Sequence, residues 1–297
     1  MTLARLPLIL LFLMLTASLH TLAADSQPET IPYGSNPQAG HHAEVNGITM
    51  YYETYGSGDP LLAIHGNGQK IADMHFQIAH FSRNYQVIVA DSRGHGKSGL
   101  GTDQLTYIQM MEDYNTLLDQ LGIAGANIIG WSDGGILSLL LAIHHPDKVS
   151  KMAIMGANLR PDETAIYPWT SELLQPLSDT VDEMISNNDT TNNWPLIRQR
   201  LNLLMTQPNI PVENLYQIKA PVLVMTGDRD IIRSEHSLEI FENLPQAHLA
   251  ILPGQTHWAP VTDPDGFNTL VEKFFDTPFT RPESREILTE ELSPPEE

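Results

Sequence analysis

The chain has 297 residues and no cysteine, and its 36 acidic side chains against 16 Lys and Arg give a formal net charge of −20. A surface this acidic repels phosphate backbones and anionic lipid head groups, which argues against nucleic acid as a partner. Without cysteine there are no disulfide bonds, so a hydrophobic core must stabilise the fold, as a chain of this size allows.

The first residues have the pattern of a secretory signal peptide. Arg5 is followed by an apolar run over residues 6–15, and small residues precede a cleavage point after Ala23. The run is too short to cross a bilayer comfortably, and an uncleaved N-terminal anchor is the alternative. We expect an exported protein, periplasmic or secreted as in bacteria, without stable membrane insertion once residues 1–23 are removed. Residues 24–42 read as an irregular leader.

Short apolar runs then alternate with longer segments that have helical spacing. In chain order the pattern predicts a hairpin over 43–56 with an Asn46-Gly47 turn, strands over 60–66, 85–91, 126–131, 151–158, 221–228 and 247–254, and helices over 73–81, 106–122, 134–145, 237–241 and 267–275. Strands that are apolar throughout are typical of a sheet covered on both faces. The expected fold class is therefore α/β, with a doubly wound, mostly parallel sheet that binds its ligand at the carboxyl ends of the strands.

Two segments fall outside this alternation. Residues 160–220 contain helix-like pieces interrupted by proline, and an insertion of this length in a compact domain is usually functional. We expect a small helical cap there, the alternative being a packed excursion with no role at the site. Residues 277–297 are rich in Pro and Glu, which predicts an acidic, disordered tail. The folded α/β domain would then cover residues 43–276.

The stretch "IIGWSDGGIL" places Ser132 between Gly130 and Gly134, where a predicted strand becomes a predicted helix. A serine at the tip of so sharp a turn has a strained backbone, and the two glycines relieve crowding around it. The hydroxyl then projects at the upper edge of the sheet. This context indicates a catalytic nucleophile more strongly than the G-x-S-x-G pattern alone.

A serine hydroxyl needs a base to remove its proton and a carboxylate to orient that base. His257 follows the last predicted strand in a glycine-containing loop, and Asp230 follows the strand before it. We therefore predict Ser132, Asp230 and His257 as the catalytic residues. Asp228 is the alternative acid, and we favour Asp230 by analogy with similar "GDRD" patterns.

Attack by the serine creates an oxyanion that needs hydrogen-bond donors. The backbone N–H of Asp133, in the first turn of the new helix, is one candidate. The backbone N–H of Asn67, in the "HGNG" corner after a strand, is the other, although "HGNG" alone can be a simple tight turn.

The sequence resembles the α/β-hydrolase superfamily over nearly the whole expected domain. The resemblance is carried by "GSGDPLLAIHGNG", "VIVADSRGHGKS", "IIGWSDGG", "APVLVMTGDRDII" and "LPGQTHW". The "GWSDGG" elbow and "TGDRDIIRSEH" look most similar to the branch of biphenyl hydrolase-like proteins such as valacyclovir hydrolase, which cleaves esters. Serine at 132 argues against the dehalogenases and epoxide hydrolases of the superfamily, because those use an aspartate nucleophile.

The resemblance implies a serine hydrolase that cleaves small carboxylic esters through an acyl-enzyme and needs no cofactor. A small-molecule ester would be its partner, and the oligomeric state is left open. Amide, lactone or carbon–carbon bond hydrolysis and perhydrolysis on the same triad are alternatives. A non-catalytic binding protein that keeps the fold is an alternative of another class.

Three side chains are expected to line the substrate pocket: Trp131, Trp258 and Asp133. The resemblance to amino-acid esterases suggests that the Asp133 carboxylate attracts a cationic amine on the substrate. The simpler alternative is that an acid in the first helical turn complements the helix dipole.

The remaining polar motifs have structural interpretations. Asp91, Arg93 and His95 of "DSRGHGKS" are expected to hold a loop by local hydrogen bonds, and His65 to be a scaffold residue. The pairs His41-His42 and His144-His145 are neighbours that do not share a helix face and lack a suitably spaced third ligand, so we expect no metal site.

Overall fold

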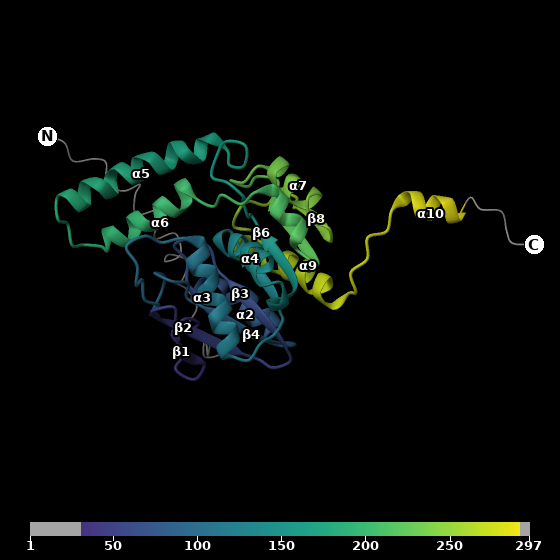
Figure 1. Ribbon diagram of the computed structural model, residues 1–297, viewed down its shortest axis with the longest axis horizontal. Helices are drawn as coiled ribbons and strands as arrows, with labels where there is room; N and C mark the ends of the chain where they lie inside the picture. Colours follow the sequence, from purple (N-terminus) through teal and green to yellow (C-terminus); the bar gives the residue numbers. More distant parts are fainter. Residues whose placement is uncertain (1–30, 292–297) are drawn as a thin grey trace, which may run out of the picture.

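The computed structural model describes residues 31–291, so the expected signal peptide and the start of the leader lie outside the described residues. One eight-stranded sheet runs through the described chain in the order β1-β2-β4-β3-β5-β6-β7-β8 (Figure 1). Its strands are β1 (Gly40–Val45), β2 (Ile48–Tyr55), β3 (Asp59–Ile64), β4 (Tyr85–Ala90), β5 (Ala126–Trp131), β6 (Val149–Met155), β7 (Val222–Gly227) and β8 (Ala247–Leu252). β2 pairs antiparallel with β1 and β4, and the strands from β3 to β8 are parallel.

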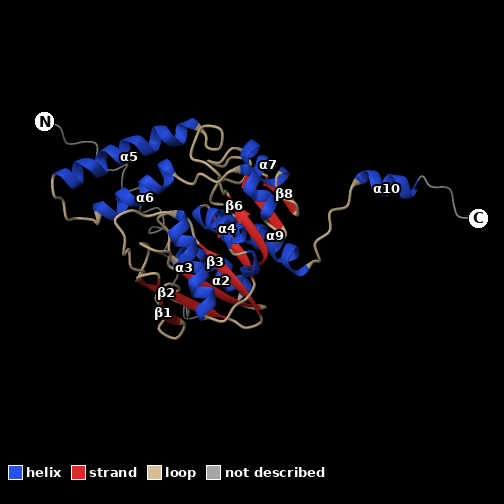
Figure 2. Ribbon diagram, viewed as in Figure 1, coloured by secondary structure: helices blue, strands red, loops and turns tan. Residues whose placement is uncertain are grey.

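Helices flank the sheet on both sides, which confirms the predicted doubly wound α/β fold (Figure 2). They are η1 (Ile71–Met74), α2 (His75–Phe81), α3 (Tyr107–Gln120), α4 (Asp133–His144), η2 (Pro146–Lys148), α5 (Pro168–Ser186), α6 (Trp194–Thr206), η3 (Val212–Gln217), α7 (Ser234–Glu242), α8 (Ala259–Thr262), α9 (Pro264–Asp276) and α10 (Ser284–Glu291).

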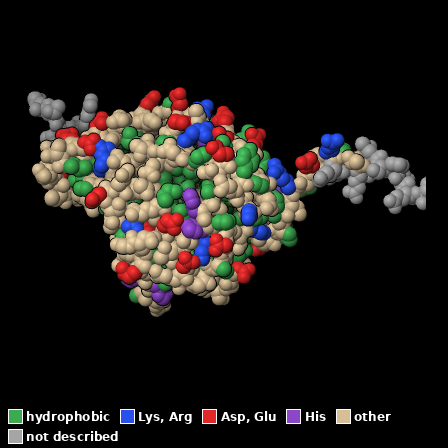
Figure 3. All heavy atoms as spheres, in the orientation of Figure 1, with side chains coloured by type: hydrophobic (Ala, Val, Ile, Leu, Met, Phe, Trp, Pro, Cys, Tyr) green, Lys and Arg blue, Asp and Glu red, His purple; other side chains and the backbone are tan. Residues whose placement is uncertain are grey.

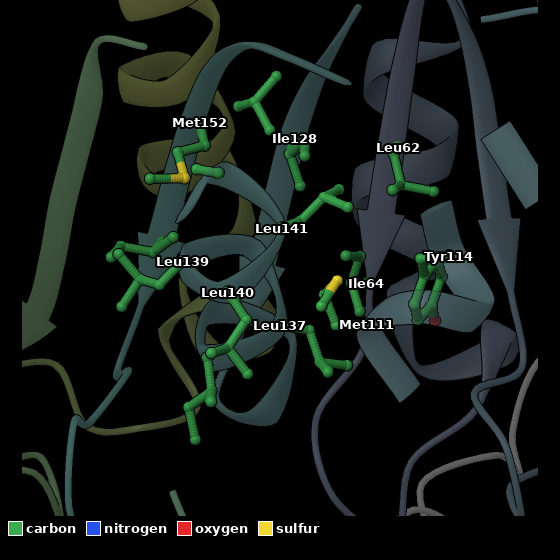
Figure 4. Close-up of a cluster of buried hydrophobic side chains, with 14 of the residues drawn as sticks. Leu62, Ile64, Met111, Tyr114, Ile128, Leu137, Leu139, Leu140, Leu141 and Met152 are labelled. Carbon is green, nitrogen blue, oxygen red and sulfur yellow. The ribbon is translucent and has the colours of Figure 1, made fainter. Parts of the chain in front are cut away.

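The core is divided between the two faces of the sheet. Successive strand residues point to opposite faces, so Leu62 belongs to the cluster under α3 and α4 while Leu61 belongs to the cluster under α2 and α9. Figure 4 shows the first cluster, in which Leu137 and Leu141 from α4 lie against the strand residues. Burial on both faces explains why the strands are apolar throughout.

Residues 160–220 connect β6 to β7 and contain α5, α6 and η3. Val181 of α5 packs against Trp194 and Leu201 of α6 in a small cluster separate from the two faces of the sheet. We call α5 and α6 the cap. Figure 1 shows the cap beside the sheet, with α6 nearer to α3 than α5 is.

The leader is more ordered than expected at its carboxyl end. β1 begins at Gly40, inside the segment predicted to be irregular, and the turns before it are bonded to the body. The backbone N–H groups of Gly34 and Asn36 donate to the carboxylate of Glu53, at 2.8 and 2.9 Å. The expected boundary at residue 43 is therefore corrected to an earlier position, because a buried acid on β2 binds the preceding turns.

The tail also differs from the prediction. After α9 the chain runs along the body, where the rings of Phe279 and His248 lie 4.8 Å apart, and it then forms α10 (Ser284–Glu291). Figure 1 shows α10 standing away from the sheet. The described part of residues 277–297 is therefore partly helical, whereas the sequence pattern predicted a disordered tail.

Charged side chains are spread over the surface. On the face drawn in Figure 3, acidic side chains are scattered over the molecule and basic side chains form no large patch. Within residues 31–291, no helix is both long and apolar enough to span a bilayer.

Candidate active site

The turn between β5 and α4 places Ser132 at the carboxyl edge of the sheet. Ser132 has φ 57° and ψ −116°, a strained backbone for a residue with a side chain, and its N–H donates to Met155 O at 2.8 Å. A Cβ on Gly130 would lie 2.4 Å from Gly134 O, and a Cβ on Gly134 would lie 2.0 Å from Ile64 O. The glycines on both sides of Ser132 are therefore required by the close approach of the backbone.

Asp230 and His257 meet at the same edge of the sheet. Asp230 Oδ1 and His257 Nδ1 lie 2.7 Å apart, and both side chains are buried. Burial alone would raise the pKa of Asp230, but the neighbouring His257 and the N–H groups of Ile232 and Gly227 hold that pKa below its usual value. An ionised carboxylate only accepts hydrogen bonds, so Nδ1 of His257 is the protonated nitrogen and Nε2 is left as a base.

The alternative acid has a different partner. Asp228 is exposed and accepts the N–H of Gly254 at 3.0 Å. The acid that lies against His257 is thus Asp230, the residue favoured by the sequence pattern.

The end of β6 connects Ser132 with His257. Met155 accepts the Ser132 N–H, and the next residue, Gly156, lies against the imidazole: a Cβ there would be 2.6 Å from His257 Cε1 and Nδ1. The Ser132 hydroxyl makes no hydrogen bond to any residue between 31 and 291. In unliganded enzymes the bond between nucleophile and base commonly tightens only when substrate binds.

Sequence reasoning missed Gly156. Its φ of +62° favours glycine, and its position at the carboxyl end of a strand was the available signal. What the sequence does not reveal is that an imidazole about a hundred residues away fills the space where its Cβ would be.

The loop after β3 lies beside Ser132. A Cβ on Gly66 would be 3.1 Å from Ser132 Cβ. Neither the backbone N–H of Asn67 nor that of Asp133 donates to another group within residues 31–291. Two unpaired N–H donors next to a strained serine are what an oxyanion hole requires.

Two side chains hold this loop in place. Ser92 N–H donates to His65 Nε2 at 3.0 Å, so the ring carries its proton on Nδ1, which donates to Gly66 O at 2.8 Å. Burial lowers the pKa of His65 to about 4, which keeps the ring neutral. The side chain of Gln69 accepts the Gly66 N–H at 2.6 Å. His65 is thus a scaffold residue, as predicted, and Gln69 is a second one that the sequence did not reveal.

The Asp133 carboxylate is buried beneath the elbow. Tyr107 donates its hydroxyl to Oδ1 at 2.8 Å, and Asn67 donates Nδ2 to Oδ2 at 3.0 Å. Burial raises the pKa of Asp133 to about 6, although these two hydrogen bonds and the nearby His257 act in the opposite direction. Both carboxylate oxygens already have protein partners, which leaves the amine-binding hypothesis without support from the geometry.

The two tryptophans have different positions. Trp131 was expected to line the pocket, and that expectation is wrong: neighbouring strand residues alternate, so Gly130 faces α4 and the Trp131 ring points into the opposite core. Its indole N–H donates to the backbone oxygen of His257 at 2.7 Å, and this bond holds the loop that carries His257. Trp258 is 43% exposed beside the His257 ring and remains a candidate pocket residue.

The "DSRGHGKS" loop is held mainly by buried hydrogen bonds. Asp91 accepts the N–H groups of Ile71 and Lys97, and Arg93 forms a buried ion pair with Asp113 at 2.6 Å. His95 Nδ1 lies 3.0 Å from Arg93 O. These contacts agree with the structural role predicted for this motif.

The histidines of the two adjacent pairs contact different side chains. The rings of His41 and His42 lie against Tyr52 and Tyr51 of β2, and His145 lies 3.0 Å from Glu112. No three His, Cys, Asp or Glu side chains of the described range are grouped as a metal site requires.

Known proteins resemble this chain over most of its length. A profile of the family described as "alpha/beta hydrolase fold" matches residues 59–192. The putative carbamate hydrolase RutD of Caulobacter sp. (strain K31) is 30% identical over 227 residues, which cover 67% of this chain and 83% of the relative. The human serine hydrolase BPHL is 27% identical over 253 residues, which cover 77% and 84% of the two chains.

A solved structure shares the fold. The enol-lactonase from Burkholderia xenovorans LB400 matches with a TM-score of 0.66 at 23% identity, over 80% of this chain and 100% of the lactonase. Profile, relatives and sheet order agree, and together they show that this chain is a hydrolase of the α/β-hydrolase family.

Proposed function

We propose that this hydrolase cleaves small carboxylic esters through an acyl-enzyme formed on Ser132. The observation that carries the proposal is the buried hydrogen bond of 2.7 Å between Asp230 and His257 at the sheet edge where Ser132 projects. That bond favours the tautomer of His257 that carries its proton on Nδ1. The other nitrogen, Nε2, is then free to accept a proton, as a general base must.

The steps follow from this arrangement. As Ser132 Oγ forms a bond to the carbonyl carbon, Nε2 of His257 takes the hydroxyl proton and Asp230 stabilises the imidazolium. The carbonyl oxygen becomes an oxyanion next to the N–H groups of Asn67 and Asp133. His257 then returns the proton to the leaving alcohol, and water repeats the sequence on the acyl group to release the acid and regenerate Ser132.

The bond that is cleaved is the part of the proposal that the relatives leave open. Their names include a carbamate hydrolase and an enol-lactonase, two chemistries that one triad can perform. A panel of p-nitrophenyl esters, amino-acid esters, lactones and carbamates, measured on one preparation, ranks these activities. Preference for a lactone or a carbamate by a factor of about 100 in kcat/KM would replace the ester proposal.

The nucleophile is tested by Ser132→Ala. We expect this variant to fold normally and to lose ester hydrolysis by at least about 10³-fold in kcat, because only the serine hydroxyl can form the acyl-enzyme. A fluorophosphonate probe should label the wild type at Ser132 and leave the variant unlabelled. Near-normal turnover by Ser132→Ala, or labelling elsewhere, would contradict the assignment.

A further inference from the structure

Asp133 and Asn67, whose backbone N–H groups are the proposed oxyanion donors, are joined to each other through their side chains. Asn67 Nδ2 donates to Asp133 Oδ2 at 3.0 Å. One residue begins α4 and the other lies in the loop after β3, so this contact connects two segments that the backbone does not connect directly.

The cap is part of the same network. The Asn67 amide nitrogen also lies 3.3 Å from the backbone oxygen of Arg200 on α6, so its two hydrogens are directed at two acceptors on different elements. Tyr107, whose hydroxyl donates to the other oxygen of Asp133, also contacts the cap. Its backbone N–H donates to Oε1 of Gln207, the residue that follows α6, at an N···O distance of 3.4 Å.

We propose that the ionised Asp133 carboxylate is a positioning group that sets the geometry of the oxyanion hole and makes it depend on the seating of the cap. This inference rests on the proposed serine-hydrolase function. Ionised, the carboxylate accepts from Asn67 and Tyr107 in charge-assisted bonds, which are stronger than bonds between neutral partners. An acid that only complemented the helix dipole would have no need of either partner.

The network has a pH signature. The titratable groups that act on Asp133 are Tyr107 from α3 and His257 from the loop after β8. Since the pKa of Asp133 is about 6, the carboxyl gains a proton as the pH falls through that value, and its bonds to Asn67 and Tyr107 weaken. The Tyr107 hydrogen bond lowers that pKa, so Tyr107→Phe should shift the acid limb of kcat to higher pH.

The first experiment measures Asp133→Asn on a neutral p-nitrophenyl ester and on an amino-acid ester. We expect kcat to fall by roughly 10- to 100-fold on both esters with little change in KM, since the loss concerns the transition state alone. A loss confined to the amino-acid ester would identify Asp133 as an amine receptor and overturn the proposal.

The second experiment measures the affinity for phenylboronic acid, which forms a tetrahedral anion on a catalytic serine. The inhibition constant should rise by the same factor as kcat falls, because both report binding of the oxyanion. If kcat and the inhibition constant of Asp133→Asn stay within about 2-fold of the wild type, the proposal fails.

Asp91→Asn is the matched control, since Asp91 is also a buried acid that accepts two N–H donors, those of Ile71 and Lys97, after the neighbouring strand β4. It should lower thermal stability and leave the boronate affinity unchanged.

If Asp133→Asn does not fold, Tyr107→Phe provides the test: an acid limb of kcat that stays at the same pH overturns the proposal. A wild type that neither hydrolyses esters nor binds boronate would overturn the proposed function together with this inference, whereas an active wild type with an unaffected Asp133→Asn overturns only the inference.

Discussion

Gly156 occupies a position where one methyl group would meet the imidazole of His257. A Cβ there would lie 2.6 Å from His257 Nδ1 and 3.4 Å from Asp230 Oδ2. We expect Gly156→Ala to displace the ring and to lower kcat by about 10²-fold or more, because misplacement of a catalytic group by roughly 1 Å costs that much. Steady-state kinetics on a neutral ester measures the loss.

The variant Gly254→Ala distinguishes the effect of backbone strain from the effect of the contact with His257. Gly254 has φ +71°, close to the +62° of Gly156, but no atom lies within 4 Å of its absent Cβ. The left-handed backbone should cost each variant about 1–2 kcal/mol of unfolding free energy, and Gly156→Ala should lose more because its Cβ also meets the buried His257 ring. Equal loss of activity in the two variants would show that strain, and not contact with His257, is responsible.

Local motifs made some site residues predictable and left others hidden. Ser132 and Asp230 are set by short patterns next to strand ends, and a strand end defines which edge a residue occupies. Tyr107 has no such pattern, and its contact with Asp133 spans 26 residues and depends on how α3 packs on α4. The position of Trp131 was predicted wrongly because the pattern shows a large ring next to Ser132 without showing which face of β5 that ring occupies.

At the scale of elements, Glu53 joins the N-terminal turns to β2. Its buried carboxylate accepts the N–H groups of Gly34 and Asn36 and the hydroxyls of Tyr51 and Tyr55, at 2.6 to 2.9 Å. Glu53→Gln puts an amide NH₂ against two of these donors, which leaves buried groups unsatisfied at about 1–3 kcal/mol each. We expect a lower midpoint of thermal unfolding and faster proteolysis within residues 31–39.

Glu44→Gln is the control for this prediction, because Glu44 is an exposed acid on the adjacent strand β1. It should change the unfolding free energy by less than about 0.5 kcal/mol, as surface substitutions usually do. Unchanged protease resistance of Glu53→Gln would mean that residues 31–39 are held by other contacts.

The strands and most helices were predictable because their apolar spacing is local and repeats. The exceptions lie at the two ends of the domain. The turns before β1 contain Pro32, Gly34 and Pro37, which read as irregular, and the buried Glu53 that orders them lies almost twenty residues further along. Long-range acceptors of this kind leave no periodic signal in the sequence.

At the scale of the whole molecule, the alternation of strands and helices predicted one parallel sheet and one shared edge for the site. It did not predict how the cap is fastened to the body. Two of the described contacts run from α6 to the loops after β3 and β4: the Arg200 backbone oxygen lies 3.3 Å from Asn67 Nδ2, and the Arg200 side chain donates to Gly94 O. Because the Asn67 side chain contacts both Asp133 and the backbone of α6, we expect a displacement of the cap to change the position of Asn67.

The pH dependence of the unfolding free energy should show the destabilising effect of burying the Asp133 carboxylate. Its pKa is about 6 in the folded chain and about 4 in an unfolded one, so between these values the folded state holds a proton that the unfolded state has lost. The stability of the wild type therefore falls as the pH rises through this window, whereas Asp133→Asn has no such term. Relative to the wild type, Asp133→Asn should gain about 1 kcal/mol of unfolding free energy between about pH 5 and about pH 7.5. Urea unfolding at the two pH values measures this gain, and Ser132→Ala, which removes no titrating group, should run parallel to the wild type. Parallel curves for Asp133→Asn as well would show that the carboxyl is ionised in both the folded and the unfolded chain across this range, so that burial does not raise its pKa.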